Sequence, residues 1–181
     1  MPSTLQLERA SDRLDLVAEP VAAFLTTLPL AAASEIYVAE IDPDLADTAA
    51  FCAEYSVPLD ESANCVLLAG RRDGQDRFAA CMVLASTRAD VNSTARRFLD
   101  VRKLSFARQD VAVAQTGMEY GGITPLGLPA GWPVLVDQAV ADAERVVIGS
   151  GLRRSKLFVP GGLLATVPGA AVLDRLGLPP G

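Results

Sequence analysis

The chain contains no histidine among its 181 residues. Histidine is the commonest general base in enzymes and a usual ligand of zinc. Its absence excludes Ser-His-Asp and Cys-His catalysis, imidazole bases and the usual zinc centres. Any chemistry must therefore depend on carboxylates, amides, hydroxyls, Lys or Arg, on backbone dipoles, or on groups of the substrate itself.

Cysteines and long apolar runs are also scarce. Cys52, Cys65 and Cys81 form no Cys-x-x-Cys pair, and the carboxylates are scattered, so we expect neither a metal nor another cofactor. No apolar run approaches the ~20 residues that span a bilayer, and no basic segment followed by an apolar run marks a secretion signal. These absences predict reduced, buried thiols in a cytoplasmic protein without a membrane segment.

Half of the residues are hydrophobic and 21% are charged, which predicts one folded domain with a real core. Apolar side chains at helical spacing from Leu14 to Leu28 predict a helical segment over residues 1–33, with a start or break at Pro20. Asp42-Pro43 is a helix-start signal, and Asp73-Gly74 between two apolar runs predicts a β-hairpin.

The remaining pattern mixes strands and helices without regular alternation, which favours a mixed α/β domain over a doubly wound parallel sheet. Predicted strands lie at 35–41, 65–69, 78–85, 103–107, 134–137, 145–148 and 156–159. Predicted helices lie at 42–55, 90–99, 110–116 and 163–166, and the tail 177–181 is expected to be frayed.

A loop with four glycines and a proline runs from Thr116 to Gly127, directly after a predicted helix that stops at Gly117. The pair Gly121-Gly122 allows main-chain N–H groups to approach a ligand closely, and Pro125 stiffens the exit of the loop. Such a loop can bind an anion or a developing oxyanion with backbone donors alone. The alternative interpretation is an ordinary surface connection.

The flanks of this loop carry a family resemblance. The succession Thr-Gly…Gly-Gly-Ile-Thr-Pro-Leu-Gly is followed by Pro-Val-Leu-Val-Asp at 133–137 and by Arg145 to Gly151, and Val57 to Leu68 lies upstream. In this order and spacing, the chain resembles the YbaK/prolyl-tRNA editing-domain family of aminoacyl-tRNA deacylases from about Ile36 to about Leu176. The resemblance implies a curved, partly closed mixed β-sheet flanked by helices. Together with the helical segment predicted at the N-terminus, it divides the chain into an N-terminal helical extension at 1–35 and a YbaK-like editing domain at 36–178, on which we expect the extension to pack.

The implied activity is that of a trans-acting deacylase, which hydrolyses the ester of mischarged tRNA. The implied partner is the acceptor end of aminoacyl-tRNA, and a synthetase partner and the oligomeric state are left open. In this resemblance, Gly121 to Pro125, which includes Ile123 and Thr124, would hold the ligand through main-chain atoms. Gly121 and Gly122 would supply donors to the oxyanion, while a substrate hydroxyl or amine activates water.

Asn64 stands where the family motif usually carries a lysine, just before the apolar run Cys65 to Leu68. Its amide can bond a carbonyl or a sugar hydroxyl but cannot compensate a phosphate. We therefore take Asn64 as a candidate catalytic residue, with a turn-capping amide as the alternative. The substitution also leaves open a divergent or non-catalytic module that binds an aminoacyl-nucleotide or the tRNA acceptor end.

The resemblance adds further candidate substrate-binding residues. Asp137 ends the predicted strand, where it either orders the pocket or caps a helix beginning at Gln138, the interpretation we favour. The turn Gly149-Ser150-Gly151 either lines the pocket or is a plain turn, and Ser150 has no histidine to activate it.

Net charge −6 and a pI near 4.6 argue against nucleic-acid binding through the general field of the protein. Local basic clusters are either solvated faces or contacts to the acceptor end of tRNA. They are Arg71-Arg72, Arg96-Arg97 with Arg102-Lys103, and Arg153-Arg154 with Lys156.

Overall fold

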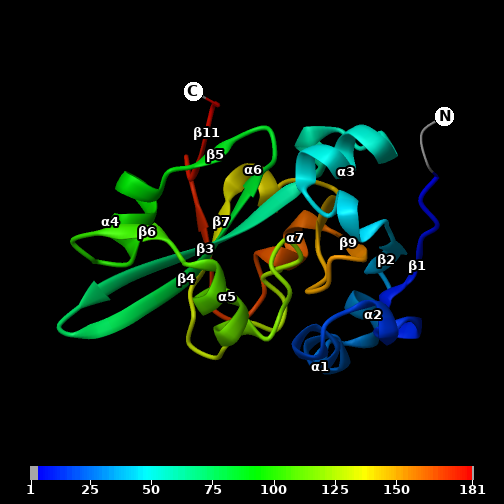
Figure 1. The fold of residues 1–181 in the computed structure, drawn as a ribbon, viewed down its shortest axis with the longest axis horizontal. Helices are drawn as coiled ribbons and strands as arrows, with labels where there is room; N and C mark the ends of the chain where they lie inside the picture. Colours follow the sequence, from blue (N-terminus) through cyan, green and yellow to red (C-terminus); the bar gives the residue numbers. More distant parts are fainter. Residues whose placement is uncertain (1–3, 181) are drawn as a thin grey trace.

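The longest elements of the computed structural model, which describes residues 4–180, are two strands of ten residues each (Figure 1). β3 (Ala63–Arg72) and β4 (Gln75–Leu84) pair antiparallel around Asp73 and Gly74, whose φ angles are 51° and 79°. Two positive φ values match the hairpin turn that Asp-Gly favours. The predicted hairpin is confirmed, and both strands are longer than their apolar runs suggested.

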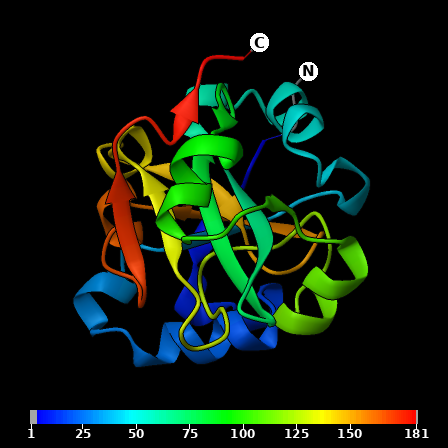
Figure 2. The ribbon, with the colours of Figure 1, turned by 90° about the vertical axis from the view of Figure 1, so that its left-hand side faces the viewer.

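The strands form two main sheets and one small one. A five-stranded sheet has the order β10 (Ala170–Leu173), β7 (Val134–Asp137), β4, β3, β6 (Leu104–Phe106), with β4–β7 and β7–β10 parallel. A four-stranded sheet has the order β1 (Glu8–Arg9), β2 (Tyr37–Glu40), β9 (Ser155–Val159), β8 (Val146–Gly149). The small sheet pairs β5 (Arg88–Ala89) with β11 (Gly177–Leu178). Figure 2 looks along the molecule from the hairpin end and shows β10, β7, β4 and β3 side by side.

The two main sheets are joined by a parallel bridge between Ser62 and Val147. This architecture confirms the mixed α/β class. The single curved sheet expected from the resemblance is divided into two sheets, which are joined by this bridge and contribute side chains to the same core cluster. The helices are α1 (Glu19–Thr27), α2 (Leu30–Ala33), α3 (Thr48–Tyr55), α4 (Arg96–Phe98), α5 (Gln109–Thr116), α6 (Gln138–Ala141) and α7 (Gly161–Leu164).

Both faces of the five-stranded sheet are covered, because alternate side chains of a strand point to opposite faces. On β4, Ala80 and Met82 join the larger core cluster, while Ala79, Cys81 and Val83 join a second cluster. Val21 and Leu25 of α1 belong to the larger cluster, so the N-terminal helix packs on the same core as the sheets. The predicted boundary near residue 35 stays a prediction. None of the helices within residues 4–180 combines the length and the apolar character needed to cross a membrane.

Several local predictions were wrong. The helix expected over 1–33 is divided into β1, two 3-10 turns, α1 with Pro20 in its first turn, and α2, and residues 1–3 lie outside the described residues. Asp42-Pro43 starts only the 3-10 turn Pro43–Leu45, and α3 begins after Asp47, whose side chain caps Ala49 and Ala50.

The C-terminal half also departs from the expected pattern in two places. The helix predicted at 90–99 opens with a short π-helix, Val91–Ala95, before α4. Gly177 and Leu178 of the supposedly frayed tail pair with β5, and residue 181 lies outside the described residues. The strands at 134–137, 145–148 and 156–159 and the helix ended by Gly117 are confirmed, with shifts of at most a few residues.

Candidate functional site

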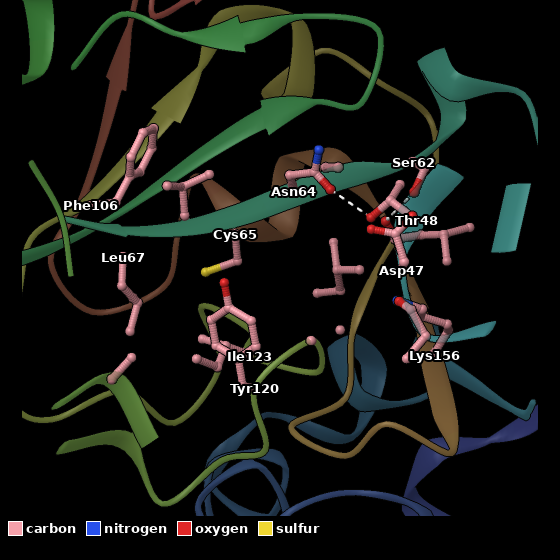
Figure 3. A pocket seen from close by; sticks show the side chains of 18 of the residues that line it. Asp47, Thr48, Ser62, Asn64, Cys65, Leu67, Phe106, Tyr120, Ile123 and Lys156 are labelled. Atoms are coloured by element: carbon pink, nitrogen blue, oxygen red, sulfur yellow. Dashed lines mark hydrogen bonds between the residues drawn. The ribbon is translucent and has the colours of Figure 1, made fainter. Parts of the chain in front are cut away.

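A cavity of about 330 Å³ lies beside the bridge between Ser62 and Val147 that joins the two main sheets (Figure 3). Its walls come from β3, from β8, from the glycine loop after α5 and from the segment that leads into α3. The volume lies at the lower end of the ~300–1,000 Å³ typical of small-molecule sites. The residues that line it are Ala46, Asp47, Thr48, Ser62, Ala63, Asn64, Cys65, Val66, Leu67, Phe106, Ala107, Ala112, Tyr120, Gly121, Ile123, Val147, Ile148, Gly149 and Lys156.

The cavity has a polar and an apolar end. Figure 3 shows Leu67 and Phe106 at one end, and Thr48, Ser62 and Lys156 at the other. Phe106 is 64% exposed, so its ring forms part of the rim rather than of the floor. A ligand with one apolar and one polar part would be oriented by this division.

Gly121, Ile123 and Asn64 line the same cavity, so the structure brings the glycine loop and Asn64 together. Gly121 has a φ of 90°, a conformation that favours glycine. Within residues 4–180, the N–H groups of Gly121 and Ile123 have no hydrogen-bond acceptor. Gly122 differs, because it lies outside the cavity lining and its N–H donates to the carbonyl of Glu119 at 2.9 Å. Free main-chain donors are therefore present at Gly121 and Ile123.

Gly122 and Gly151 hold the loop in place. The N–H of Gly151 donates to the carbonyl of Gly122 at 2.7 Å, and the N–H of Glu119 donates to the carbonyl of Gly151 at 2.8 Å. A Cβ on Gly122 would lie 2.5 Å from the carbonyl oxygen of Leu152. These glycines let the backbone of the loop lie directly against the turn after β8, and only Gly149 of the predicted turn also reaches the cavity.

Two further loop residues do not reach the cavity. Thr124 is fully buried, and its hydroxyl has no hydrogen-bond partner in the part of the chain that is described. Pro125 lines a separate groove beside Trp132. Ile123 is therefore the last residue of the loop to line the cavity, and the predicted ligand contacts of Thr124 and Pro125 have no counterpart there.

Asp137 and Ser150 also lie outside the cavity lining. Asp137 stands at the N-cap position of α6, but its side chain makes no cap bond and instead accepts from the N–H of Gly177 at 2.9 Å. Ser150 is buried, and its hydroxyl lies 2.7 Å from that of Ser155 and accepts from the N–H of Leu152. These contacts are those of a serine that stabilises its own turn, as in the second interpretation of Ser150.

Asn64 is a strand residue, paired with Val83 in the β3–β4 ladder, so the turn-capping alternative does not hold. Its side-chain oxygen accepts a hydrogen bond from the Thr48 hydroxyl at 2.7 Å. The contact connects the first residue of α3 to β3 across the polar end of the cavity, as the dashed line in Figure 3 shows.

Lys156 is the charged cavity residue buried most deeply among those that were not predicted from the sequence as site residues, which also include Thr48, Ser62, Phe106 and Tyr120. The sequence groups Lys156 with Arg153-Arg154 in a cluster interpreted either as a solvated face or as a contact to the tRNA acceptor end, yet Lys156 is only 6% exposed and lines the polar end of the cavity. Its ammonium donates to the carbonyl of Ala46 at 2.8 Å and lies 5.4 Å from the centre of the Phe51 ring. Burial lowers the pKa of Lys156 to about 8. A lone lysine inside the apolar strand Ser155–Val159 was the signal that could have revealed it.

No group of three or more acidic or cysteine side chains within residues 4–180 is placed to hold a metal ion. The cavity offers main-chain donors, the amide of Asn64, the hydroxyls of Thr48, Ser62 and Tyr120, the carboxylate of Asp47 and the ammonium of Lys156. This set suits hydrogen bonding to a neutral or anionic oxygen ligand.

Comparison with known proteins shows which family and which solved structures the chain resembles. A family model described as the aminoacyl-tRNA editing domain matches residues 42–166. A structure from work on computational epitope grafting onto scaffold proteins is 21% identical, with a TM-score of 0.72 over 91% of this chain and 97% of that one. A candidate trans-editing enzyme for prolyl-tRNA synthetase is 20% identical, with a TM-score of 0.71 over 90% and 96%. A hypothetical protein is 20% identical, with a TM-score of 0.73 over 88% and 100%. At such identities, the structural likeness shows the fold alone.

Proposed function

The chain belongs to the aminoacyl-tRNA editing-domain family, and from that premise we propose that it is a trans-acting deacylase of the prolyl-tRNA editing type, which hydrolyses the ester of mischarged tRNA. One observation carries the proposal. Gly121 and Ile123, whose N–H groups have no acceptor in the described chain, line the same cavity as Asn64. Unpaired N–H donors beside a small cavity can bind the carbonyl oxygen of an ester and stabilise the oxyanion formed during its hydrolysis.

The proposed chemistry depends on positioning. Ester hydrolysis passes through a tetrahedral oxyanion, and a preorganised N–H donor contributes about two to three orders of magnitude in rate. With no histidine in the chain, an amine or hydroxyl of the substrate takes the proton of the attacking water. The protein holds the ester against the donors and excludes bulk water.

The separation of the cavity into an apolar and a polar end suggests how the substrate lies in it. Leu67, Ala112 and Ile123 offer an apolar surface to a small amino-acid side chain. Asn64, with an amide that donates as well as accepts, suits a carbonyl or ribose hydroxyl. Phe106 and Tyr120 are 64% and 51% exposed and stand at the rim, where aromatic faces can stack on the terminal base of the tRNA.

A local charge asymmetry supports tRNA as the partner. Residues 71–108 contain nine Lys and Arg against four Asp, a net charge of +5 in a chain whose total is −6. The hairpin end, α4 and the start of β6 gather at one end of the molecule (Figure 1), where Arg77 donates to the carbonyl of Leu99. We call its exposed cations, Arg71, Arg77, Arg97, Arg102 and Lys103, the basic face.

The basic face leads to the cavity. Lys103 directly precedes β6, which ends at the rim residue Phe106, about 10 Å further along the strand at ~3.3 Å per residue. A tRNA backbone lying on the basic face would therefore bring its acceptor end to the opening of the cavity, where phosphates need cationic contacts.

The test is incubation of the purified protein with a panel of mischarged tRNAs and measurement of amino-acid release. We expect release well above the buffer rate with a tRNA that carries a small amino acid, and a loss of about tenfold or more in Asn64→Ala. Release at the buffer rate with every tRNA of the panel would overturn the proposal.

A second candidate is a non-catalytic module that binds the acceptor end, and the uncharged Asn64 favours it. The variant Asn64→Lys discriminates between the two. A large gain in hydrolysis would indicate a binder that lacks only a charge at this position, whereas loss of an existing activity would assign a role to the amide itself.

A further inference from the structure

We propose that Lys156 is a catalytic residue of this cavity, where its ammonium donates a hydrogen bond to the carbonyl oxygen of the substrate ester and stabilises the negative charge that develops there. The inference rests on the proposed function and names a residue outside the editing-family motif identified in the sequence. Asn64 enters the cavity from β3 of the five-stranded sheet, and Lys156 enters it from β9 of the four-stranded sheet. The positive charge missing at position 64 is thus present in the same cavity.

The packing of the core does not explain why position 156 carries a charged side chain. A charge that is removed from water without a paired carboxylate is expensive, and an apolar side chain of similar length would fill the space at lower cost. Lys156 forms no ion pair within the described chain, and the carbonyl of Ala46 is the acceptor for one of its three donors. The chain has only two lysines, and one of them lines the cavity.

The neighbouring groups leave this charge available to a ligand. Asp47 and Cys52 approach Lys156 from α3, and Arg153 approaches it from the turn before β9. The Asp47 carboxylate is engaged in capping the N-terminus of α3, and burial raises the pKa of Cys52, which keeps the thiol neutral. Arg153 adds a second positive charge, and its guanidinium donates hydrogen bonds to the carbonyls of Tyr120 and Pro43. Two cations, Lys156 and Arg153, against the one carboxylate of Asp47 leave a net positive charge at the polar end of the cavity, which favours an anionic group there.

Depth favours the reacting ester over a tRNA phosphate. The Lys156 side chain is almost completely buried, whereas a backbone phosphate carries its charge before and after binding and is best held near solvent. An ester is neutral in the ground state and becomes anionic only in the tetrahedral state. A buried cation therefore acts mainly on the transition state, which is what accelerates a reaction.

The step balances without any further reactant. Water adds to the carbonyl carbon and passes a proton to the substrate's own amine or hydroxyl, and the electron pair of the C=O bond moves to the oxygen beside Lys156. The tetrahedral anion then collapses, the bond to the ribose oxygen breaks, and the transferred proton ends on that oxygen. Lys156 keeps its proton throughout, and the products are the free amino acid and the tRNA hydroxyl.

The binding test uses two non-hydrolysable aminoacyl-adenosine analogues, one joined by a planar amide and one by a tetrahedral, anionic phosphonate. We expect the unmodified protein to bind the phosphonate at least about tenfold more tightly than the amide, since the phosphonate imitates the oxyanion. Lys156→Met should lose this preference, whereas Lys156→Arg and the matched charge deletion Arg9→Met, on the exposed strand β1, should keep it. A preference that persists in Lys156→Met, with thermal melting to show that the variant is folded, overturns the inference.

Kinetics provide a second readout. In Lys156→Met, kcat should fall about 100-fold while KM changes less than about threefold, as for loss of a transition-state donor. A change confined to KM would overturn the inference, because it would make the ammonium a ground-state binding group. The substrate amine titrates in the same range and affects every variant alike, so the pH test uses the ratio of kcat in the unmodified protein to kcat in Lys156→Met. This ratio should fall as pH rises through about 8, where Lys156 loses its proton, whereas the ratio of Lys156→Arg to Lys156→Met should not fall there. A ratio that rises through pH 8 in the unmodified protein would reveal Lys156 as a neutral amine base and would also overturn the inference.

The two proposals fail separately. If no tRNA is hydrolysed but the phosphonate preference disappears in Lys156→Met, the proposed deacylase function fails while the anion-binding role of Lys156 stands. If tRNA is hydrolysed at an unchanged rate by folded Lys156→Met, the deacylase function stands and the assignment of Lys156 fails.

Discussion

The hydroxyl of Thr48 donates a hydrogen bond of 2.7 Å to the side-chain oxygen of Asn64. This contact uses the acceptor of the amide and leaves its two N–H donors without a partner in the described part of the chain. Asn64 can therefore offer donors to an oxygen ligand, and Thr48 fixes which side of the amide does so. The relationship gives α3 a role in the site that its sequence position did not suggest.

Replacing Thr48 by valine, which has nearly the same shape, tests this role. We expect kcat/KM for deacylation to fall about three- to tenfold because the amide of Asn64 is no longer oriented, while the free energy of unfolding changes by only about 1 kcal/mol. Thr26→Val is the matched control, since the Thr26 hydroxyl bonds only the carbonyl of Ala23 on the exposed face of α1. Equal kcat/KM in Thr48→Val and the unmodified protein would contradict the prediction.

Gly149 is expected to be intolerant of even one added methyl group. A Cβ at this position would lie 2.3 Å from the carbonyl oxygen of Gly122 and 2.6 Å from that of Ile123, so Gly149→Ala must displace the glycine loop. We expect the free energy of unfolding to fall by about 2 kcal/mol or more, with loss of deacylation.

The control for this variant is Gly162→Ala in α7, where the nearest atom to the added methyl would be the carbonyl oxygen of Ala141 at 4.0 Å. This change should be neutral or stabilise the protein by up to ~1 kcal/mol through helix propensity. Urea unfolding curves of both variants measure the difference. Similar midpoints for the two would show that the loop does not depend on a close backbone approach at Gly149.

The parts of the fold that sequence predicted are those governed by neighbouring residues. The hairpin at Asp73-Gly74 follows from turn chemistry, the helix stop at Gly117 from its left-handed conformation, and strand 134–137 from a short run of apolar residues. Asp42 was also a local signal, but it competed with Asp47, whose side chain caps the longer helix.

The site required long-range information. Whether Lys156 turns inward depends on how β9 is placed against α3, and the strand itself offers only a polar residue among apolar ones. Asp137 occupies the predicted capping position, but its partner Gly177 is distant in sequence and belongs to a segment that was expected to be frayed. Gly149 is required by a backbone contact with the loop at Gly122, which no local pattern reports.

The basic face should bind tRNA through phosphates. In the double variant Arg97→Ala/Arg102→Ala, we expect KM for tRNA to rise several-fold at low salt with little change in kcat. The slope of log affinity against log salt should decrease by roughly 0.7 to 0.9 for each phosphate that no longer meets a cation. Arg9→Ala removes an exposed cation at the other end of the molecule and should leave both quantities unchanged. An unchanged salt slope in the double variant would exclude this face as the site of phosphate binding.

The buried ammonium of Lys156 should also make the stability of the protein depend on pH. Its pKa of about 8 in the folded state lies below the ordinary value of 10.5, so between these two values the unfolded chain binds more protons. Below pH 8, burial of the charged Lys156 therefore lowers the free energy of unfolding by an amount on the order of 3 kcal/mol. This penalty decreases as pH rises from about 8 to 10.5, so the protein becomes more stable across that range.

Chemical unfolding at pH 7, 8, 9 and 10 should show Lys156→Met to be stabilised relative to the unmodified protein at pH 7, with a difference that shrinks as pH rises. Lys156→Arg, which keeps its proton throughout this range, should lack the same pH dependence. If the curves of the unmodified protein and of Lys156→Met run parallel from pH 7 to 10, Lys156 is not titrating in the window that its burial in the cavity requires.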